Sequence, residues 1–203
     1  PPTCAPTGFA HPFTMAFQPI VALDGDRVYA HEALVRAPGG GSAAAVLRHV
    51  TPANQRAFHR LSRRRAFALA AGQLAVGERL SLNLQPGAVE TSACFLEELL
   101  EDAAGSGLAA HQLILEITES ERARDPIGLA RAADRWRAAG VLTAIDDFGA
   151  GHAGLSLLAD WQPDLLKLDM SLIRGIDADP VREAIVAGLI GLAGRLGATL
   201  VAE

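Results

Sequence analysis

Short apolar runs alternate with longer helical patterns along most of the chain, and this alternation limits the fold more than any other feature. The runs have the length and composition of strands, and the stretches between them are rich in Ala, Leu and Arg. Such alternation is typical of βαβ units that form a mostly parallel sheet. The predicted strands are Met15–Val21, Val28–Val35, Leu80–Leu84, Leu113–Thr118, Leu142–Asp146, Leu165–Asp169 and Thr199–Glu203.

Glycines mark where several of the helices should end. Gly72, Gly140 and Gly197 can each take the left-handed conformation that closes a helix. The first two strands flank the short turn Asp24–Asp26, which leaves no room for a crossover helix, so they should form an antiparallel hairpin. The predicted helices are Ala43–Val50, Pro52–Gly72, Ala93–Gly105, Pro126–Gly140, Gly154–Asp160 and Val181–Gly197.

Length and composition favour a single globular domain. The 203 residues can bury a sizeable core, and residues 1–14 read as an N-terminal tail before a domain that covers 15–203. No apolar run approaches the ~18 residues of a membrane helix, and no signal peptide is recognisable, so a cytoplasmic location is expected. The net charge of −5 argues against bulk attraction for DNA or RNA.

Polar residues at the predicted strand ends distinguish a barrel from a doubly wound sheet. In a TIM-like (β/α)8 barrel the functional groups gather where the strands end, and the placement of polar residues here favours that fold. One further carboxylate, Glu32, lies inside an apolar strand. The residues that end or follow strands are Asn83, Glu116, Asp146, Asp147, Lys167, Asp169 and Glu203.

These carboxylates predict a metal centre. A carboxylate inside an apolar strand costs several kcal/mol unless it is paired or bound to a cation. Oxygen donors from several strands suit Mg²⁺ or Mn²⁺, and the adjacent Asp146 and Asp147 could serve two ions in a clamp for phosphodiester cleavage. Lys167 could orient a water or stabilise charge on phosphorus, or it could close the barrel as a plain ion pair. Glu119 could anchor a loop or cap a helix.

The ordered motifs resemble the EAL family of cyclic di-GMP phosphodiesterases. The resemblance runs from about Phe13 to the last residue, and its name-giving tripeptide is Glu32-Ala33-Leu34. The other matching motifs are Gln18-Pro19-Ile20, Asn83 in an Asn-x-x-Pro setting, Glu116-Ile117-Thr118-Glu119, Asp146-Asp147-Phe148-Gly149-x-Gly151, Lys167-Leu168-Asp169 and Ala202-Glu203.

The resemblance implies a role for each site residue. Glu32, Asn83, Glu116 and Asp146 would hold one metal, and Asp146, Asp147 and Glu203 would hold or approach a second. Lys167 would position the hydrolytic water with Asp169 beside it, Gln18 and Arg36 would contact the dinucleotide, and Glu119 would anchor the loop that contains His152. The implied reaction opens cyclic di-GMP to linear pGpG.

The resemblance also implies context. It predicts a homodimer. The sequence is also similar to a subgroup of the family that is fused to BLUF and other sensor domains. In the family, Glu203 is followed by a helix, an eighth strand and a last helix, so the barrel is expected to be truncated before its last strand. A catalytically silent cyclic di-GMP receptor or protein-interaction module is the alternative function. A TIM barrel of unrelated chemistry is the third reading.

Overall fold

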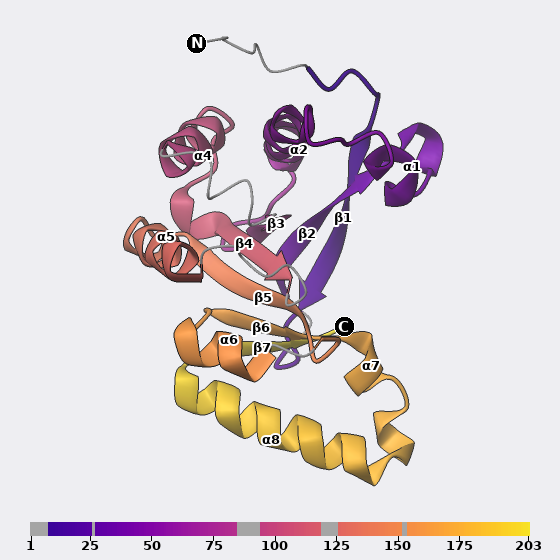
Figure 1. The fold of residues 1–203 in the computed structure, drawn as a ribbon, viewed down its shortest axis with the longest axis vertical. Coiled ribbons are helices and arrows are strands. Elements are labelled where there is room, and N and C mark those ends of the chain that lie inside the picture. The colour runs from indigo at the N-terminus through magenta and orange to yellow at the C-terminus, as the bar shows by residue number, and fades with distance from the viewer. Residues whose placement is uncertain (1–7, 26, 85–93, 119–125, 152–153) are drawn as a thin grey trace. The chain divides into compact units, whose positions relative to one another are not determined.

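The computed structural model describes residues 8–25, 27–84, 94–118, 126–151 and 154–203 (Figure 1). The chain forms two compact units. The N-terminal unit contains residues 1–82 and 94–113, and the C-terminal unit contains residues 83–93 and 114–203. Among the helices within the described ranges, none is long and apolar enough to cross a lipid bilayer.

The N-terminal unit is built on an antiparallel hairpin. Strand β1 (Thr14–Val21) pairs with β2 (Val28–Arg36), and β3 (Arg79–Asn83) then runs parallel to β2. The turn between β1 and β2 is too short for a crossover, which forces the antiparallel pairing. The helices of this unit are the 3-10 helix η1 (Pro38–Gly40), α1 (Ala43–Leu47), α2 (Gln55–Ala70), α4 (Phe95–Ala104) and the 3-10 helix η2 (Ala110–Gln112).

Helix α2 buries one apolar face and exposes arginines on the other. Phe58 packs with Phe9, Phe13 and Val46 in one core cluster, and the rings of Phe9 and Phe58 lie 4.8 Å apart. This one-sided burial is what holds an amphipathic helix on a globular core. The buried residues of α2 are Phe58, Ala66, Phe67 and Ala70.

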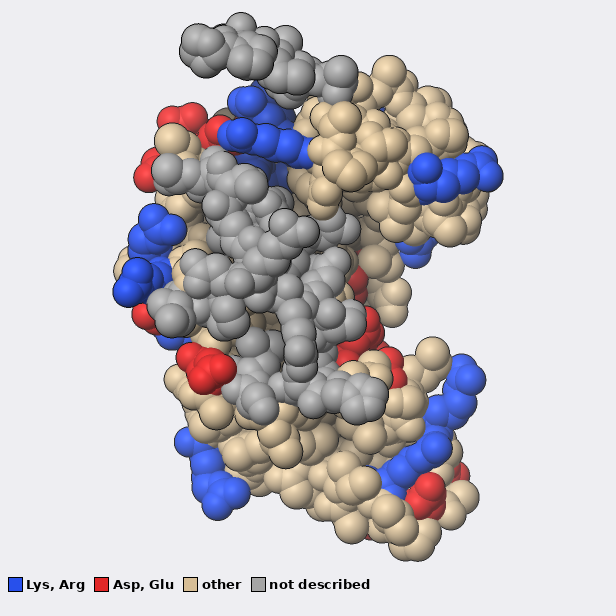
Figure 2. Space-filling view, viewed as in Figure 1, with Lys and Arg blue, Asp and Glu red and all other residues tan. Residues whose placement is uncertain are grey.

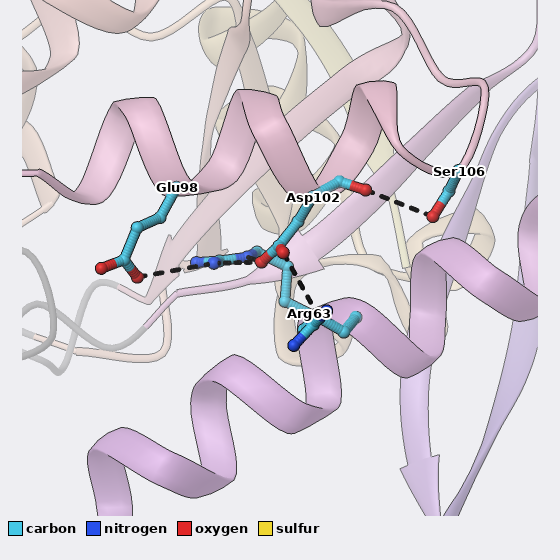
Figure 3. Close-up of polar contacts among 5 residues, drawn as sticks. Arg63, Glu98, Asp102 and Ser106 are labelled. Carbon is cyan, nitrogen blue, oxygen red and sulfur yellow. Dashed lines mark hydrogen bonds and ion pairs between the residues drawn. The ribbon is translucent and has the colours of Figure 1, made fainter.

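Ion pairs join α2 to the acidic helix α4 (Figure 3). Arg63 donates from Nη2 and Nε to Asp102 Oδ2 at 2.6 and 3.2 Å, and Arg64 Nε lies 3.3 Å from the other oxygen of Asp102. Glu98 Oε2 lies 3.9 Å from Arg63 Nη2. The space-filling view shows basic side chains over α2 beside acidic ones over α4 (Figure 2). Opposite charge therefore fixes these two helices against each other.

The C-terminal unit is a parallel sheet with helical connections. Its strands are β4 (Leu113–Thr118), β5 (Leu142–Phe148), β6 (Leu165–Leu168) and β7 (Thr199–Ala202), paired in chain order. Its helices are α5 (Pro126–Ala138), α6 (Gly154–Asp160), α7 (Met170–Ile173), the 3-10 helix η3 (Ile176–Ala178) and α8 (Pro180–Leu196). Helix α5 packs on β5, and α8 packs on β7 (Figure 1).

The predicted elements are confirmed with small shifts at their ends. All the predicted strands, the antiparallel hairpin and the predicted helices are present. Gly72, Gly140 and Gly197 have φ angles of 79°, 86° and 73°, as expected for residues that close helices. The short helix α7 was not predicted, and its N-cap, Asp169, is the residue at which the β6 strand was expected to end.

Candidate active site

Charged residues gather at one edge of the C-terminal sheet. Its strands run parallel, so their carboxyl ends meet at the same edge. Glu116 lies in β4, Asp146 and Asp147 lie in β5, Lys167 lies in β6, and Glu203 directly follows β7. Glu116 and Lys167 are each 1% exposed, and Asp146 is 7% exposed. Charges buried to this extent require partners of opposite sign.

The ammonium of Lys167 lies among three of these carboxylates. Nζ donates to Glu116 Oε2 at 3.0 Å. It also lies 2.8 Å from Asp146 Oδ1 and 2.7 Å from Glu203 Oε1. A compact ammonium with three N–H donors suits a position close to several carboxylates. The structure therefore brings together four residues that the sequence singled out separately.

A local irregularity of β5 explains how adjacent aspartates can serve one site. In a regular strand, the side chains of Asp146 and Asp147 would point to opposite faces of the sheet. The pairing of β5 with β6 shifts between Ile145 and Phe148, and Asp147 has a φ of 54°. That φ lies in the left-handed region, which non-glycine residues rarely occupy. The bulge re-aims the chain, so that both carboxylates reach the same edge.

Asp146, Asp147 and Glu203 form an acidic triad that fits a divalent cation. One carboxylate oxygen from each residue lies within 4.8 Å of the other two. Hard cations such as Mg²⁺ and Mn²⁺ prefer oxygen ligands of this kind. Unusual backbone conformations such as that of Asp147 cluster at functional sites, where the surrounding structure maintains them. The donor set and the backbone geometry are both those expected of a metal centre.

Asn83 and Thr118 lie beside the buried Glu116. The N–H of Leu84, the residue after Asn83, donates to the carbonyl of Glu116 at 2.8 Å, so this segment runs along β4. Thr118 shares the face of Glu116 and stands opposite Asp146 in the β4–β5 pairing. Its buried hydroxyl has no hydrogen-bond partner among the described residues. Sequence reasoning gave Thr118 no role, although its two-residue spacing from Glu116 is the signal that places it on this face.

In the N-terminal unit, the predicted site residues share one face of the hairpin. Gln18 stands opposite Glu32 in the β1–β2 pairing, and Arg36 follows Glu32 by four strand positions. Glu32 is buried at 8% exposure. Arg36 is half-buried, and its Nη1 donates to the carbonyl of Val35 at 2.8 Å. Gln18, Glu32 and Arg36 thus lie on the same face of the hairpin.

Asp169 occupies a different position from the one expected. It lies one residue beyond β6, where its carboxylate accepts a hydrogen bond from the Ser171 N–H at 2.8 Å and caps α7. Hydrogen bonds from the side chain and the backbone of Ser171 lower the pKa of Asp169. Aspartate is a preferred helix N-cap, and this preference ends the strand early. Glu119 and His152, predicted to act in a loop, lie outside the described residues.

Gly149 follows the aspartate pair and packs closely against α7. Its φ is 101°, which favours glycine. A Cβ at this position would lie 2.5 Å from Leu172 Cδ1, so a larger residue would displace that side chain. Glycine is therefore favoured at this position by both its backbone conformation and its close packing.

Comparison with known proteins gives a consistent family relationship. The family profile described as EAL domain matches residues 10–203. The chain is 33% identical over 176 residues to the blue light- and temperature-regulated antirepressor BluF of Escherichia coli, which covers 86% of this chain and 43% of that protein. It is 35% identical over 125 residues to the cyclic di-GMP phosphodiesterase PA2567 of Pseudomonas aeruginosa, which covers 62% of this chain and 21% of that protein. The chain thus spans less than half the length of either relative.

Solved structures of similar sequence share the fold. A standalone EAL protein of Vibrio cholerae, in its c-di-GMP-bound form, is 38% identical with a TM-score of 0.87, covering 95% of this chain and 81% of that one. A manganese and cyclic di-GMP complex of Klebsiella pneumoniae BlrP1 is 37% identical with a TM-score of 0.87, covering 98% of this chain and 51% of that one. The predicted TIM-like fold with an antiparallel first strand pair is confirmed by this likeness.

Proposed function

Because the chain belongs to the EAL domain family, we propose that it hydrolyses cyclic di-GMP to linear pGpG with divalent metal ions held at its acidic strand ends. The observation that carries the proposal is the acidic triad of Asp146, Asp147 and Glu203, whose oxygens lie within 4.8 Å of one another. A relative named as a cyclic di-GMP phosphodiesterase supports the reaction. Complexes of a similar protein with manganese or calcium and the cyclic dinucleotide support the metal requirement.

We assign the metal ligands to two overlapping sets. Glu32, Asn83, Glu116 and Asp146 hold one Mg²⁺ or Mn²⁺ ion, and Asp146, Asp147 and Glu203 hold the other. Bound metal would supply Lewis acidity and an activated water for attack on phosphorus. A cytoplasmic setting is also proposed. A homodimer and an upstream sensor domain are proposed from the family, and the blue-light-regulated relative supports the sensor. The domain itself is proposed to cover residues 15–203, after a tail.

The remaining site residues bind the dinucleotide and control water and protons. Lys167 provides a fixed positive charge, which would orient the hydrolytic water and stabilise negative charge that develops on phosphate oxygens. Asp169 follows two residues after Lys167 and assists it, and it also caps the short helix α7. Gln18 and Arg36 contact the dinucleotide from the hairpin, since a planar guanidinium suits phosphate oxygens. Glu119 anchors the loop that follows β5.

Chromatographic measurement of pGpG formation tests the proposal directly. Purified protein should convert cyclic di-GMP in the presence of Mn²⁺ or Mg²⁺ and lose this activity in excess EDTA. Asp146→Asn and Glu32→Ala should each abolish turnover. Asp177→Asn is the matched control, because Asp177 is an exposed carboxylate in η3, and it should retain activity. Undiminished conversion by Asp146→Asn would refute the assignment of the site.

A second function has support from one relative. BluF is named an antirepressor, which describes action on another protein and not hydrolysis. The chain could accordingly be a silent cyclic di-GMP receptor or interaction module. Calorimetry with cyclic di-GMP and Ca²⁺ measures binding, and the Mn²⁺ assay measures turnover on the same preparation. Binding without turnover would favour the receptor, and turnover would favour the phosphodiesterase.

A further inference from the structure

Lys167 is the single lysine of the chain. The other seventeen of its eighteen basic residues are arginines. The two side chains differ physically, because an ammonium is a compact charge with three donors and a guanidinium is a wide planar fork. Lys167 lies in the middle of the parallel sheet and is 1% exposed. The only lysine in the sequence is thus buried and surrounded by three carboxylates.

The contacts of Lys167 overlap with the acidic triad. Asp146 and Glu203 each place an oxygen within 2.8 Å of Nζ, and both also belong to the triad with Asp147. Around the ammonium, three carboxylates carry three negative charges against one positive charge. The ammonium is therefore outnumbered by the carboxylates that lie within 3.0 Å of it. The same two carboxylates face both the ammonium and the proposed metal.

We propose that Lys167 is the resident cation of this cluster, which holds the carboxylates together in the metal-free protein and weakens the binding of divalent metal. The inference rests on the proposed metal-dependent function. Without a cation, the buried Glu116 and its neighbours would repel each other, so Lys167 stabilises the empty site. A divalent ion that uses Asp146 and Glu203 must share them with the ammonium and bind close to a like charge. Lys167 therefore sets the metal concentration at which the site fills.

Replacement of Lys167 by a neutral side chain of similar length tests both parts of the proposal. Lys167→Met should bind Mn²⁺ at least about tenfold more tightly than the wild type, as measured by electron paramagnetic resonance of free Mn²⁺. In EDTA the variant should have a lower thermal midpoint than the wild type, and saturating Mn²⁺ should raise its midpoint more. Arg195→Met removes the same charge from the exposed surface of α8, and its Mn²⁺ affinity should equal that of the wild type.

A second measurement keeps the proposal testable if the variant does not fold. Wild-type protein labelled with ¹⁵N-lysine should give a single side-chain signal, since no other lysine is present. Titration with diamagnetic Mg²⁺ should shift this signal along a saturable curve. Asp147→Asn, which removes a triad ligand but leaves Glu116, Asp146 and Glu203 around the ammonium, should need more Mg²⁺ for the same shift.

The outcomes separate this inference from the proposed function. If the wild type binds Mn²⁺ and Lys167→Met binds it with equal or weaker affinity, the resident-cation role is overturned and the metal site remains. A lysine signal that does not move while Mg²⁺ binds would overturn it in the same way. If neither protein binds metal, the metal-dependent function fails and the inference fails with it. Tighter binding of Mn²⁺ by Lys167→Met supports both the metal-dependent function and the resident-cation role of Lys167.

Discussion

Asp147 combines an unfavourable backbone conformation with crowded negative charge, so its replacement should stabilise the metal-free protein. A left-handed backbone costs an L-residue roughly 1–2 kcal/mol, although aspartate tolerates it better than most. Its carboxylate lies within 4.8 Å of oxygens of Asp146 and Glu203. Two unit charges at that distance repel by about 3.5 kcal/mol at an effective dielectric constant of about 20, and by about 0.9 kcal/mol in water. Lys167 offsets part of this repulsion.

Two substitutions separate the charge from the backbone. Asp147→Asn keeps the shape and the tolerance of positive φ, and it should raise the free energy of unfolding by about 1–2 kcal/mol through relief of repulsion. Asp147→Gly also removes the backbone strain, but the glycine gives back roughly 0.5–1 kcal/mol through the greater freedom of the unfolded chain. Its net stability should exceed that of Asp147→Asn by less than about 1 kcal/mol.

Urea unfolding followed by circular dichroism in EDTA measures both changes. The gain of Asp147→Asn should shrink in about 1 M NaCl, because salt screens repulsion between partly exposed charges. With saturating Mn²⁺ the order should reverse, since the wild type then gains binding energy that the variants lack. Asp177→Asn, on the exposed surface, should change stability by less than about 0.5 kcal/mol. If Asp147→Asn were less stable than the wild type in EDTA at low salt, the argument from charge crowding would be wrong.

Three further predictions concern stability, and urea or acid unfolding measures each. Asp164→Ala should cost about 1–3 kcal/mol, because the N–H and hydroxyl of buried Thr143, at 2.8 and 2.9 Å, lose their acceptor. Arg63→Met should lower the free energy of unfolding by about 1.5–3 kcal/mol, and Arg64→Met by about 0–1 kcal/mol. The difference is expected because the Arg63 side chain is 10% exposed and that of Arg64 is 59% exposed. Equal losses would contradict the argument from burial. Asp169→Asn should change little at neutral pH, because asparagine also caps helices. The lowered pKa of Asp169 means that its stabilising contribution disappears as the pH falls through that pKa, so the variant should lose less stability in acid than the wild type.

The fold was largely predictable because its signals are local. Strands buried on both faces read as continuous apolar runs such as Leu113–Thr118, and glycines such as Gly140 and Gly197 mark helix ends through their positive φ. The turn at Asp24–Asp26 predicted the antiparallel pair for a steric reason. The short helix α7 escaped prediction, since four residues carry no periodic pattern.

The candidate site was predictable in its membership but not in its geometry. Strand-end positions identified Glu116, Asp146 and Lys167, because parallel strands must bring their carboxyl ends to one edge. The left-handed conformation of Asp147 leaves no mark in the sequence, since the bulge arises from pairing with β6, a strand that comes later in the chain. The capping role of Asp169 was missed because strand and helix-cap preferences compete at one residue, and the structure alone decides between them.

Carboxylates at the two ends of the C-terminal sheet have different surroundings. This difference indicates, without reference to any motif, that the functional site lies at the carboxyl ends. At the amino ends of β5 and β6, Asp164 is satisfied by Thr143 and approached by Arg137 at 3.5 Å, so its charge is matched. At the carboxyl ends, the carboxylates of Glu116, Asp146 and Glu203 all lie within 3.0 Å of the Lys167 ammonium, and the neighbouring Asp147 has a left-handed backbone. Such a concentration of carboxylates is expected where a cation binds, because the bound ion adds positive charge beside them.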